Sequence, residues 1–240
     1  PSYAMYILNA DTFTVTDNVI NGVLNNNYSN PSIGAMVIEN SKYFSIKRNT
    51  INDVKLTTNH IIQYALLVKG NSTNGQVSEN KISNVTNTGT GMVRTLCVDV
   101  SGSNSNLVLA NNFITDVTTN GTTTNAAHGI FLQGGSGIKV YYNTIKLNLN
   151  QNNSSAALYI NGGNQIDIRN NIFTNTGSQG VRYAIYANVS ASAFSAINNN
   201  NYYAQYVGYL NSDRTTLAQW RTATGKDAAS VSVLPTFNTD

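Results

Sequence analysis

The stretch Val15-Thr-Asp-Asn18-Val-Ile20 decides the fold, because the chain repeats its pattern at a nearly constant spacing. The pattern has apolar ends and an asparagine in the middle. Six later copies are centred on Asn49, Asn80, Asn112, Asn143, Asn171 and Asn200. The steps between these asparagines are almost equal and shorten slightly only before Asn171 and Asn200. A sustained period of about 30 residues is typical of a solenoid in which each repeat forms one coil.

A second pattern lies about half a repeat before each of these asparagines. It has a small residue followed by alternating apolar positions, which predicts a strand with one buried face. The copies begin at Ala4, Ala35, Ala65, Thr95, Gly129, Ala157 and Ala184. The residues on either side of each asparagine predict two more short strands, with Val15 and Ile20 facing inward. We therefore expect an all-β, right-handed, three-sheet parallel β-helix of about seven coils.

The repeated asparagine has a structural interpretation. Asparagine is one of the few residues that tolerate a left-handed backbone, so we expect it to form the sharp turn between the second and third strands. Its side-chain amide can also bond the same amide one coil away, which satisfies polar groups inside the coil. We therefore predict an Asn ladder along the solenoid, and we assign the ladder no catalytic role.

The composition narrows the class of function. The 240 residues carry a net charge of +3, and only 10% of them are charged. No basic run is interleaved with aromatic residues, so we do not expect nucleic acid as a partner. No apolar segment is long enough to span a bilayer, so we expect no direct membrane insertion. The single cysteine, Cys97, cannot form a disulfide within the chain, and we expect no metal and no cofactor.

These repeats resemble the right-handed parallel β-helix of the pectin-lyase-like superfamily. Coils of that superfamily share a small-apolar-x-apolar segment and an apolar-x-x-Asn-x-Ile segment, and the resemblance covers residues 1–203. The tail, residues 215–227 followed by residues 230–237, resembles the end of β-helix domains in secreted proteins of Bacteroidota-type bacteria. The resemblance implies an extracellular or cell-surface bacterial protein. Because the chain opens at Pro1 inside a repeat, we interpret it as a segment of a longer protein with further domains.

Residues 204–240 predict a cap. The open end of a solenoid exposes strand edges and core side chains, which need a cover. We expect a short helix over residues 217–222, closed by Gly225, that lays Leu217 and Trp220 over the last coil. A terminal strand follows it in this interpretation.

One outward row of the first strand is apolar and aromatic, which is unusual for a solvated sheet face. In the repeat alignment this row holds Tyr6, Val37, Leu67, Cys97, Phe131, Tyr159 and Tyr186. Phe131, Tyr159 and Tyr186 can stack on sugar rings, which predicts a polysaccharide or cell-surface glycan as the partner. The alternative is that the long loops before these strands fold over the row. In the superfamily that the repeats resemble, such loops form the substrate groove.

The row just before the first strand predicts the sharpest enzymatic site. It places Tyr64, Arg94 and His128 on consecutive coils, with Lys69 on the same face. A polysaccharide lyase needs a base for the proton next to a uronate carboxylate, and a cation that stabilises the resulting enolate. The alternative is a polar rim at the junctions between loops and strands.

Charged residues also form rows with a structural interpretation. Alternating charges on stacked coils favour the correct register, and two such rows are Asp17, Arg48, Glu79 and Glu39, Lys69, Asp99. A third polar row holds Asp53, Asn84 and Asp116. With about 4.8 Å per coil, its carboxylates lie too far apart to share one calcium ion.

Three functions follow from these observations. We expect first a non-catalytic extracellular or cell-surface module that acts as a stalk or adhesin and offers a carbohydrate-binding surface. The second is a polysaccharide lyase that acts on an acidic glycan. The third is a tailspike-like glycan-binding module that trimerises.

Overall fold

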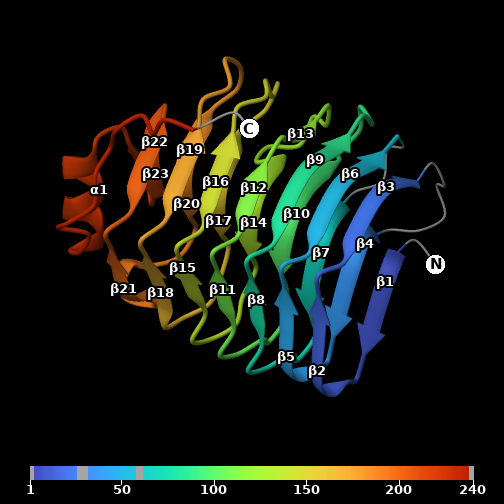
Figure 1. Cartoon of the computed structure of the whole chain (residues 1–240). Coiled ribbons are helices and arrows are strands. Elements are labelled where there is room, and N and C mark those ends of the chain that lie inside the picture. The colour runs from blue at the N-terminus through green and yellow to red at the C-terminus, as the bar shows by residue number, and fades with distance from the viewer. Residues whose placement is uncertain (1–2, 26–31, 58–61, 238–240) are drawn as a thin grey trace.

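The computed structural model describes residues 3–25, 32–57 and 62–237, which wind into a parallel β-solenoid of about six turns (Figure 1). This is close to the seven coils expected from the repeats. Within these residues the strands form three sheets, because each coil supplies strands to all three in turn. The all-β, three-sheet prediction is therefore confirmed.

Sheet A has nine strands within the described residues. In spatial order they are β1 (Tyr3–Leu8), β4 (Ser32–Glu39), β7 (Ile62–Lys69), β10 (Arg94–Val100), β14 (Ala127–Leu132), β17 (Ser155–Ile160), β20 (Arg182–Ala187), β23 (Tyr206–Leu210) and β24 (Asp213–Arg214). Pairing along this sheet is parallel except between β23 and β24, which are antiparallel.

Sheets B and C complete each coil. Sheet B contains β2 (Asp11–Thr16), β5 (Lys42–Lys47), β8 (Gln76–Ser78), β11 (Val108–Ala110), β15 (Lys139–Tyr141), β18 (Ile166–Arg169) and β21 (Phe194–Asn198). Sheet C contains β3 (Val19–Asn25), β6 (Thr50–Leu56), β9 (Lys81–Asn87), β12 (Phe113–Thr115), β13 (Val117–Thr119), β16 (Thr144–Leu147), β19 (Ile172–Asn175) and β22 (Asn201–Ala204). A short 3-10 helix, η1 (Ala191–Ala193), precedes β21.

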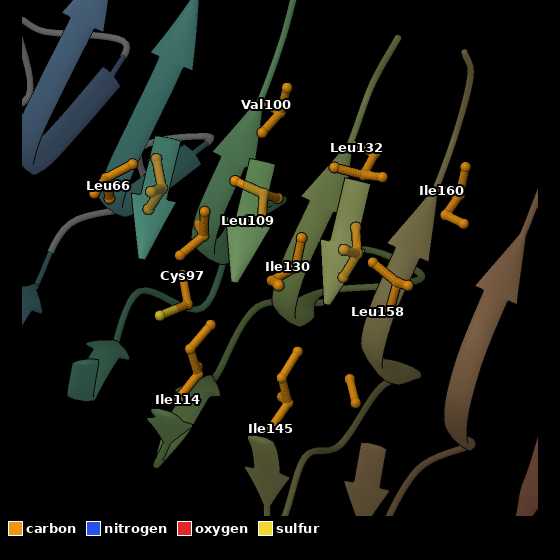
Figure 2. Packing of buried hydrophobic residues seen from close by; sticks show 14 of the residues in the cluster. Leu66, Cys97, Val100, Leu109, Ile114, Ile130, Leu132, Ile145, Leu158 and Ile160 are labelled. Carbon is orange, nitrogen blue, oxygen red and sulfur yellow. The ribbon is translucent and has the colours of Figure 1, made fainter. Parts of the chain in front are cut away.

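The core fills the space that the three sheets enclose. The inward rows predicted for the second and third strands are confirmed, since Val15 lies beside Ile46 and Ile20 lies beside Ile51. Figure 2 shows how side chains from successive coils meet, with Leu109 of sheet B and Ile114 of sheet C on the same core. Each fully buried aliphatic side chain of this kind contributes about 1.5–3 kcal/mol to folding.

The predicted Asn ladder is confirmed. From Asn18 onward each amide nitrogen donates to the amide oxygen of the ladder asparagine on the next coil. The bond from Asn80 to Asn112 is 3.0 Å long. The amide of Asn112 also donates to the Val77 carbonyl at 2.9 Å. The ladder therefore satisfies main-chain and side-chain groups that are closed off from water.

The predicted backbone of the ladder asparagine is wrong. The residue before it, and not the asparagine, adopts the left-handed conformation, with φ of 58° at Asp17, 53° at Arg48 and 55° at Tyr142. The ladder side chain is buried inside the coil, so its more exposed neighbour makes the turn. Some of these turn positions hold residues other than asparagine, and the left-handed backbone is disfavoured for them.

A second polar ladder joins sheets A and B. Main-chain nitrogens of Ala10 and Ser41 donate to the hydroxyls of Ser41 and Ser72, each at 3.2 Å. The Ser72 nitrogen donates to the Asn104 side chain at 2.9 Å. The sequence did not indicate this ladder, because the residue type changes from serine to asparagine along it.

The C-terminal end carries the predicted helical cap, α1 (Leu217–Thr224), visible at one end of the solenoid (Figure 1). Thr216 and Gln219 form a capping box at its start, and Gly225 ends it with φ of 64°. Trp220 is fully buried, and its Nε1 donates to Asp227 Oδ2 at 2.7 Å. The expectation that Trp220 covers the last coil is therefore confirmed.

Candidate functional site

The outer face of sheet A carries the side chains that the sequence singled out. On β17, Leu158 points into the core, whereas Tyr159 belongs to a separate apolar cluster on the outside. Strand pairing places four rings in one row on successive coils, here called the aromatic row: Phe131, Tyr159, Tyr186 and Tyr209. Alternation along the strands, and not a loop, therefore presents this row outward.

The register of β10 differs from the prediction by two positions. Val98 lies beside Leu66 on one side and Ile130 on the other. The small residue that leads this copy is therefore Cys97, not Thr95. Cys97 is buried in the core, where Figure 2 shows it among the apolar side chains, and burial raises the pKa of its thiol. The expectation that Cys97 belongs to the outward row is wrong.

This error has an identifiable cause. Thr95 and Cys97 are both small, and each is followed by apolar residues at the required positions. The spacing distinguishes them, because the step from Ala65 to Cys97 equals the step from Asn80 to Asn112. A start at Thr95 makes the first of these steps shorter than the second. Matching the two steps within one coil was the signal that could have fixed the register.

The corrected register separates the predicted catalytic set. Leu96, not Arg94, lies between Tyr64 and His128 on consecutive coils. Arg94 pairs with Ile62, at the start of the strand. Tyr64 is buried, and Arg94 is partly exposed. The three residues share one face but do not form the single row from which the site was inferred.

His128 is buried, and its imidazole is engaged by the protein. Its Nε2 bonds the Asn125 carbonyl at 2.7 Å, and its ring stacks against Phe131 with centroids 5.5 Å apart. Burial lowers the pKa of His128 to about 3, so the ring is neutral at physiological pH. An imidazole in this setting packs the sheet face and reaches no bulk solvent.

Lys69 has the structural partner predicted for it. Its Nζ lies 2.8 Å from Glu39 Oε2, and Glu39 also accepts a hydrogen bond from the Tyr6 hydroxyl. The hydrogen bond from Lys69 lowers the pKa of Glu39, and the bond to Glu39 raises the pKa of Tyr6 to about 12. Lys69 is therefore held as a counter-ion.

The other charge rows are confirmed in part. Arg48 and Asp17 form an ion pair at 2.7 Å across coils. Asp99 does not stack with Lys69, because the register of β10 places Asp99 two positions earlier, beside Leu67. The third polar row is left-handed at every position, with φ of 55° at Asp53, 55° at Asn84 and 56° at Asp116.

Asp99 is a buried carboxyl that the predicted register misplaced. It lies between Leu67 and Phe131 in the outward row, and Gln133 Nε2 donates to its two oxygens at 3.0 and 2.8 Å. Burial raises the pKa of Asp99 to about 7, against the opposing hydrogen bond from Gln133. Asp99 can therefore change its protonation state near neutral pH inside the sheet face.

Three rings of the aromatic row stack face to face, whereas the ring of Phe131 is tilted by 52° against that of Tyr159. Tyr159 and Tyr186 have centroids 4.7 Å apart and an interplanar angle of 6°. Tyr186 and Tyr209 are 4.3 Å apart at 4°. Stacking covers both faces of Tyr186 and one face of Tyr159. Phe131 is only 4% exposed. Sugar stacking on Phe131, Tyr159 or Tyr186 is therefore restricted by this stacking and burial.

A loop residue reaches the aromatic row, as the alternative interpretation expected. The side chain of Asn125, in the loop before β14, lies close enough to the phenols of Tyr159 and Tyr186 to lower their pKa against the effect of burial. Burial raises the pKa of Tyr159, and it raises that of Tyr186 to about 12. Both phenols are therefore neutral hydrogen-bonding groups at physiological pH. Parts of the loops before β4 and β7, including His60, lie outside the described residues.

Neither a family model, nor a curated protein, nor a solved structure matches this chain. In residues 3–25, 32–57 and 62–237, no three His, Cys, Asp or Glu side chains gather as metal ligands. None of the helices in the same residues is long and apolar enough to cross a membrane.

Proposed function

We propose that this chain is a non-catalytic β-solenoid module at a bacterial cell surface or outside the cell, where it acts as a stiff stalk or adhesive surface. The observation that carries the proposal is that the fold itself uses the candidate catalytic groups. His128 is buried against Phe131, and Lys69 is paired with Glu39. The Asn ladder and the continuous core support stiffness, because neighbouring coils pair in all three sheets and share one core.

We further propose that the module belongs to the pectin-lyase-like superfamily and comes from a secreted protein of a Bacteroidota-type bacterium. This rests on the repeat pattern and on the capped C-terminal segment. A fold of this kind hosts enzymes, tailspikes and adhesins, so the activity depends on individual side chains.

We place the glycan-binding surface of this module on the hydroxyl edge of the aromatic row. Tyr186 and Tyr209 are partly exposed and present phenol groups that can donate to and accept from sugar hydroxyls. In the variant Tyr186→Phe the stacked ring stays and the hydroxyl is lost. Tyr43→Phe on sheet B, where Tyr43 is 58% exposed, is the matched control.

Glycan arrays and affinity electrophoresis test this surface. We expect retention of wild type and Tyr43→Phe, with binding by Tyr186→Phe weakened about fivefold, the effect of losing one neutral hydrogen bond. If wild type is not retained by any glycan, or if Tyr186→Phe binds equally well, the glycan-binding part of the proposal is wrong and a stalk remains.

The lyase alternative is decided by a separate assay. A lyase leaves unsaturated sugar ends that absorb ultraviolet light, so wild type and Arg94→Ala are incubated with pectate, alginate and glycosaminoglycans. We expect no rise in absorbance with either protein. A rise that Arg94→Ala abolishes would establish the lyase instead. Sedimentation as a trimer would favour the tailspike-like module.

A further inference from the structure

Two stacked tyrosines close the aromatic row at the C-terminal end of the solenoid. β20 and β23 are neighbouring parallel strands of sheet A near α1 (Figure 1), and their register places Tyr186 beside Tyr209. The ring centroids are 4.3 Å apart, and the interplanar angle is 4°. Because both side chains leave paired positions of parallel strands, the two rings point the same way. The ring carbons next to the two phenol oxygens are therefore held close together.

The neighbouring ring of Tyr183 is arranged differently. It meets Tyr186 at 81° and Tyr209 at 84°, so the edge of one ring lies against the face of the other. Its hydroxyl donates to Asp213 Oδ1 at 2.9 Å, which restrains the ring. Tyr183 stacks on Tyr206 with centroids 5.3 Å apart and a tilt of 26°. Of these pairs, Tyr186 and Tyr209 are the closest and the most nearly parallel.

Solvent reaches this pair, whereas other easily oxidised side chains are buried. Tyr186 and Tyr209 are both partly exposed. Cys97 and Trp220, the single cysteine and the single tryptophan of the chain, are fully buried in the core. A bulky oxidant at this surface therefore meets the two phenols and neither the thiol nor the indole.

Stacked phenols suit oxidative coupling. Burial raises the pKa of Tyr186 to about 12, so at neutral pH its phenol loses a proton to water when it loses an electron. The unpaired electron of the resulting phenoxyl radical is shared with the ring carbons next to the oxygen. Two such radicals on neighbouring rings join at these carbons without having to diffuse together, which favours this pair over separate tyrosines. Each joined carbon then releases its hydrogen as a proton, and each oxygen takes up a proton and becomes a phenol again.

We propose that Tyr186 and Tyr209 form a modification site, which a haem peroxidase supplied with hydrogen peroxide joins as dityrosine. The two phenols together lose two electrons and two protons, hydrogen peroxide takes up both and becomes two water molecules, and one carbon–carbon bond forms. The bond links β20 to β23 at the capped end of the solenoid. It closes a loop in the unfolded chain, as a disulfide does. The site needs no glycan, so it can fail while the proposed function stands.

Oxidation of the dilute protein by a haem peroxidase and hydrogen peroxide tests the site, with dityrosine fluorescence as the readout. We expect wild type to gain this fluorescence and to remain a monomer on a denaturing gel. Tyr186→Phe keeps a stacked ring but loses the phenol, so it should gain at least about fivefold less fluorescence. Tyr43→Phe is the matched control and should gain as much as wild type, because it removes a phenol that is 58% exposed on sheet B.

Tryptic peptides identify the coupled pair. No lysine or arginine interrupts residues 183–214 before the last position, so Tyr186 and Tyr209 lie in one peptide. Tyr159, which also stacks on Tyr186, lies in another peptide, residues 147–169. A bond between Tyr186 and Tyr209 lowers the mass of their shared peptide by two hydrogen atoms, whereas a bond to Tyr159 joins two peptides. We expect the first product to predominate.

Two further variants separate the rings within the shared peptide. Tyr209→Phe should reduce the lighter peptide at least about fivefold, and Tyr206→Phe, which removes the phenol that stacks on Tyr183, should leave it unchanged. The melting temperature of wild type should rise by about 5 °C on oxidation, and that of Tyr209→Phe should not. An unchanged melting temperature of oxidised wild type would overturn the link between the strands.

The remaining contrary results overturn the site itself. These are no dityrosine in wild type, an equal yield of the lighter peptide in Tyr209→Phe, or dityrosine found only in cross-linked dimers. A loss in Tyr43→Phe as large as that in Tyr186→Phe would also overturn it, because it would show random oxidation of surface tyrosines. Melting curves before oxidation confirm that each variant is folded.

Discussion

Left-handed residues make the sharp turns of the solenoid, and many of them are not glycine. Arg48, Glu79 and Tyr142 occupy equivalent turns with φ of 53°, 57° and 55°. For such side chains this conformation costs roughly 1–2 kcal/mol. The neighbouring ladder asparagines offset this cost, because the turn lets each buried amide reach the next coil. The strained turn and the ladder hydrogen bond therefore form together.

Tyr142→Gly tests the strain at one turn. Tyr142 is 58% exposed, so the change removes backbone strain and little packing. We expect the free energy of unfolding to rise by about 0.5–1 kcal/mol, less than the full strain because glycine also gains freedom in the unfolded chain. Asn111→Gly should change stability less, since asparagine tolerates φ of 56°. Denaturant titration would contradict this account if Tyr142→Gly were destabilised.

Asp99 makes stability depend on pH. Its folded pKa is about 7, above the ordinary value of 3.8, so the folded state disfavours its ionised form. The stability contributed by protonated Asp99 is fully present below about pH 4 and is lost as the pH rises through about 7. We expect Asp99→Asn to be more stable than wild type by about 2 kcal/mol at alkaline pH, and to lack this loss.

Urea titrations at a series of pH values measure the effect. Asp116→Asn is the control, because Asp116 is partly exposed at a turn. Wild type and Asp116→Asn should weaken together as the pH rises, whereas Asp99→Asn should not. Parallel curves for all three proteins would show that Asp99 has an ordinary pKa.

Among the strands, the Asn ladder links neighbouring coils through hydrogen bonds between side chains. Asn112→Ala leaves the main-chain and side-chain nitrogens of Asn80 without their acceptor at Asn112 Oδ1. We expect a loss of about 2–4 kcal/mol from these buried donors. Asn18→Ala at the end of the ladder should cost less, about 1 kcal/mol at most, because Asn18 is not fully buried. Equal losses in denaturant titrations would show that the ladder is not a buried network.

The cap depends on one side chain. Trp220 packs on Tyr202 with ring centroids 6.2 Å apart, and both donate to Asp227 Oδ2 at 2.7 Å. We expect Trp220→Ala to cost about 3–5 kcal/mol, from the cavity and the lost bond. Trp220→Phe should cost less, because the ring remains. Thermal unfolding of both variants checks this order, and equal melting temperatures for all three proteins would contradict it.

The elements were predictable wherever one row has one residue type. The row from Ile20 to Ile145 is uniform, and its register was predicted correctly. At β10 the row changes from Leu67 to Asp99, and the alignment slipped by two positions. An apolar alternation can be satisfied by two nearby starts, so only the step shared with the ladder separates them. The slip by two changed every neighbour of this strand, and it placed Cys97 on the outer face although Cys97 lies in the core.

For the whole molecule, the fold could be predicted from the sequence and the sites could not. Rows of side chains follow from the repeat, whereas burial follows from loops and neighbours that the repeat does not specify. The sequence identified His128 as a candidate residue, but it did not show that His128 bonds the Asn125 carbonyl. The stacking of Tyr209 on Tyr186 was also hidden, because β23 lies beyond the last copy of the repeated strand pattern. Function in such a chain therefore lies where coils differ.

Under the proposed function, the whole solenoid is one stiff body whose candidate catalytic groups serve packing. One core cluster extends from Val15 near the first coil to Trp220 in the cap. A second cluster on the outside of sheet A runs from Val37 to Tyr183. His128 stacks on Phe131 of that outer cluster, so its ionisation reports directly whether the face is packed or open.

NMR titration of His128 tests directly whether this face of the sheet is closed to solvent. The variant His60→Gln removes the other histidine and leaves a single imidazole to follow. With the pKa of His128 lowered to about 3 by burial, its ring signals should not move between about pH 8 and about pH 5. A titration centred near pH 6.5 would instead show a solvated imidazole, available as a base, and would contradict the non-catalytic account.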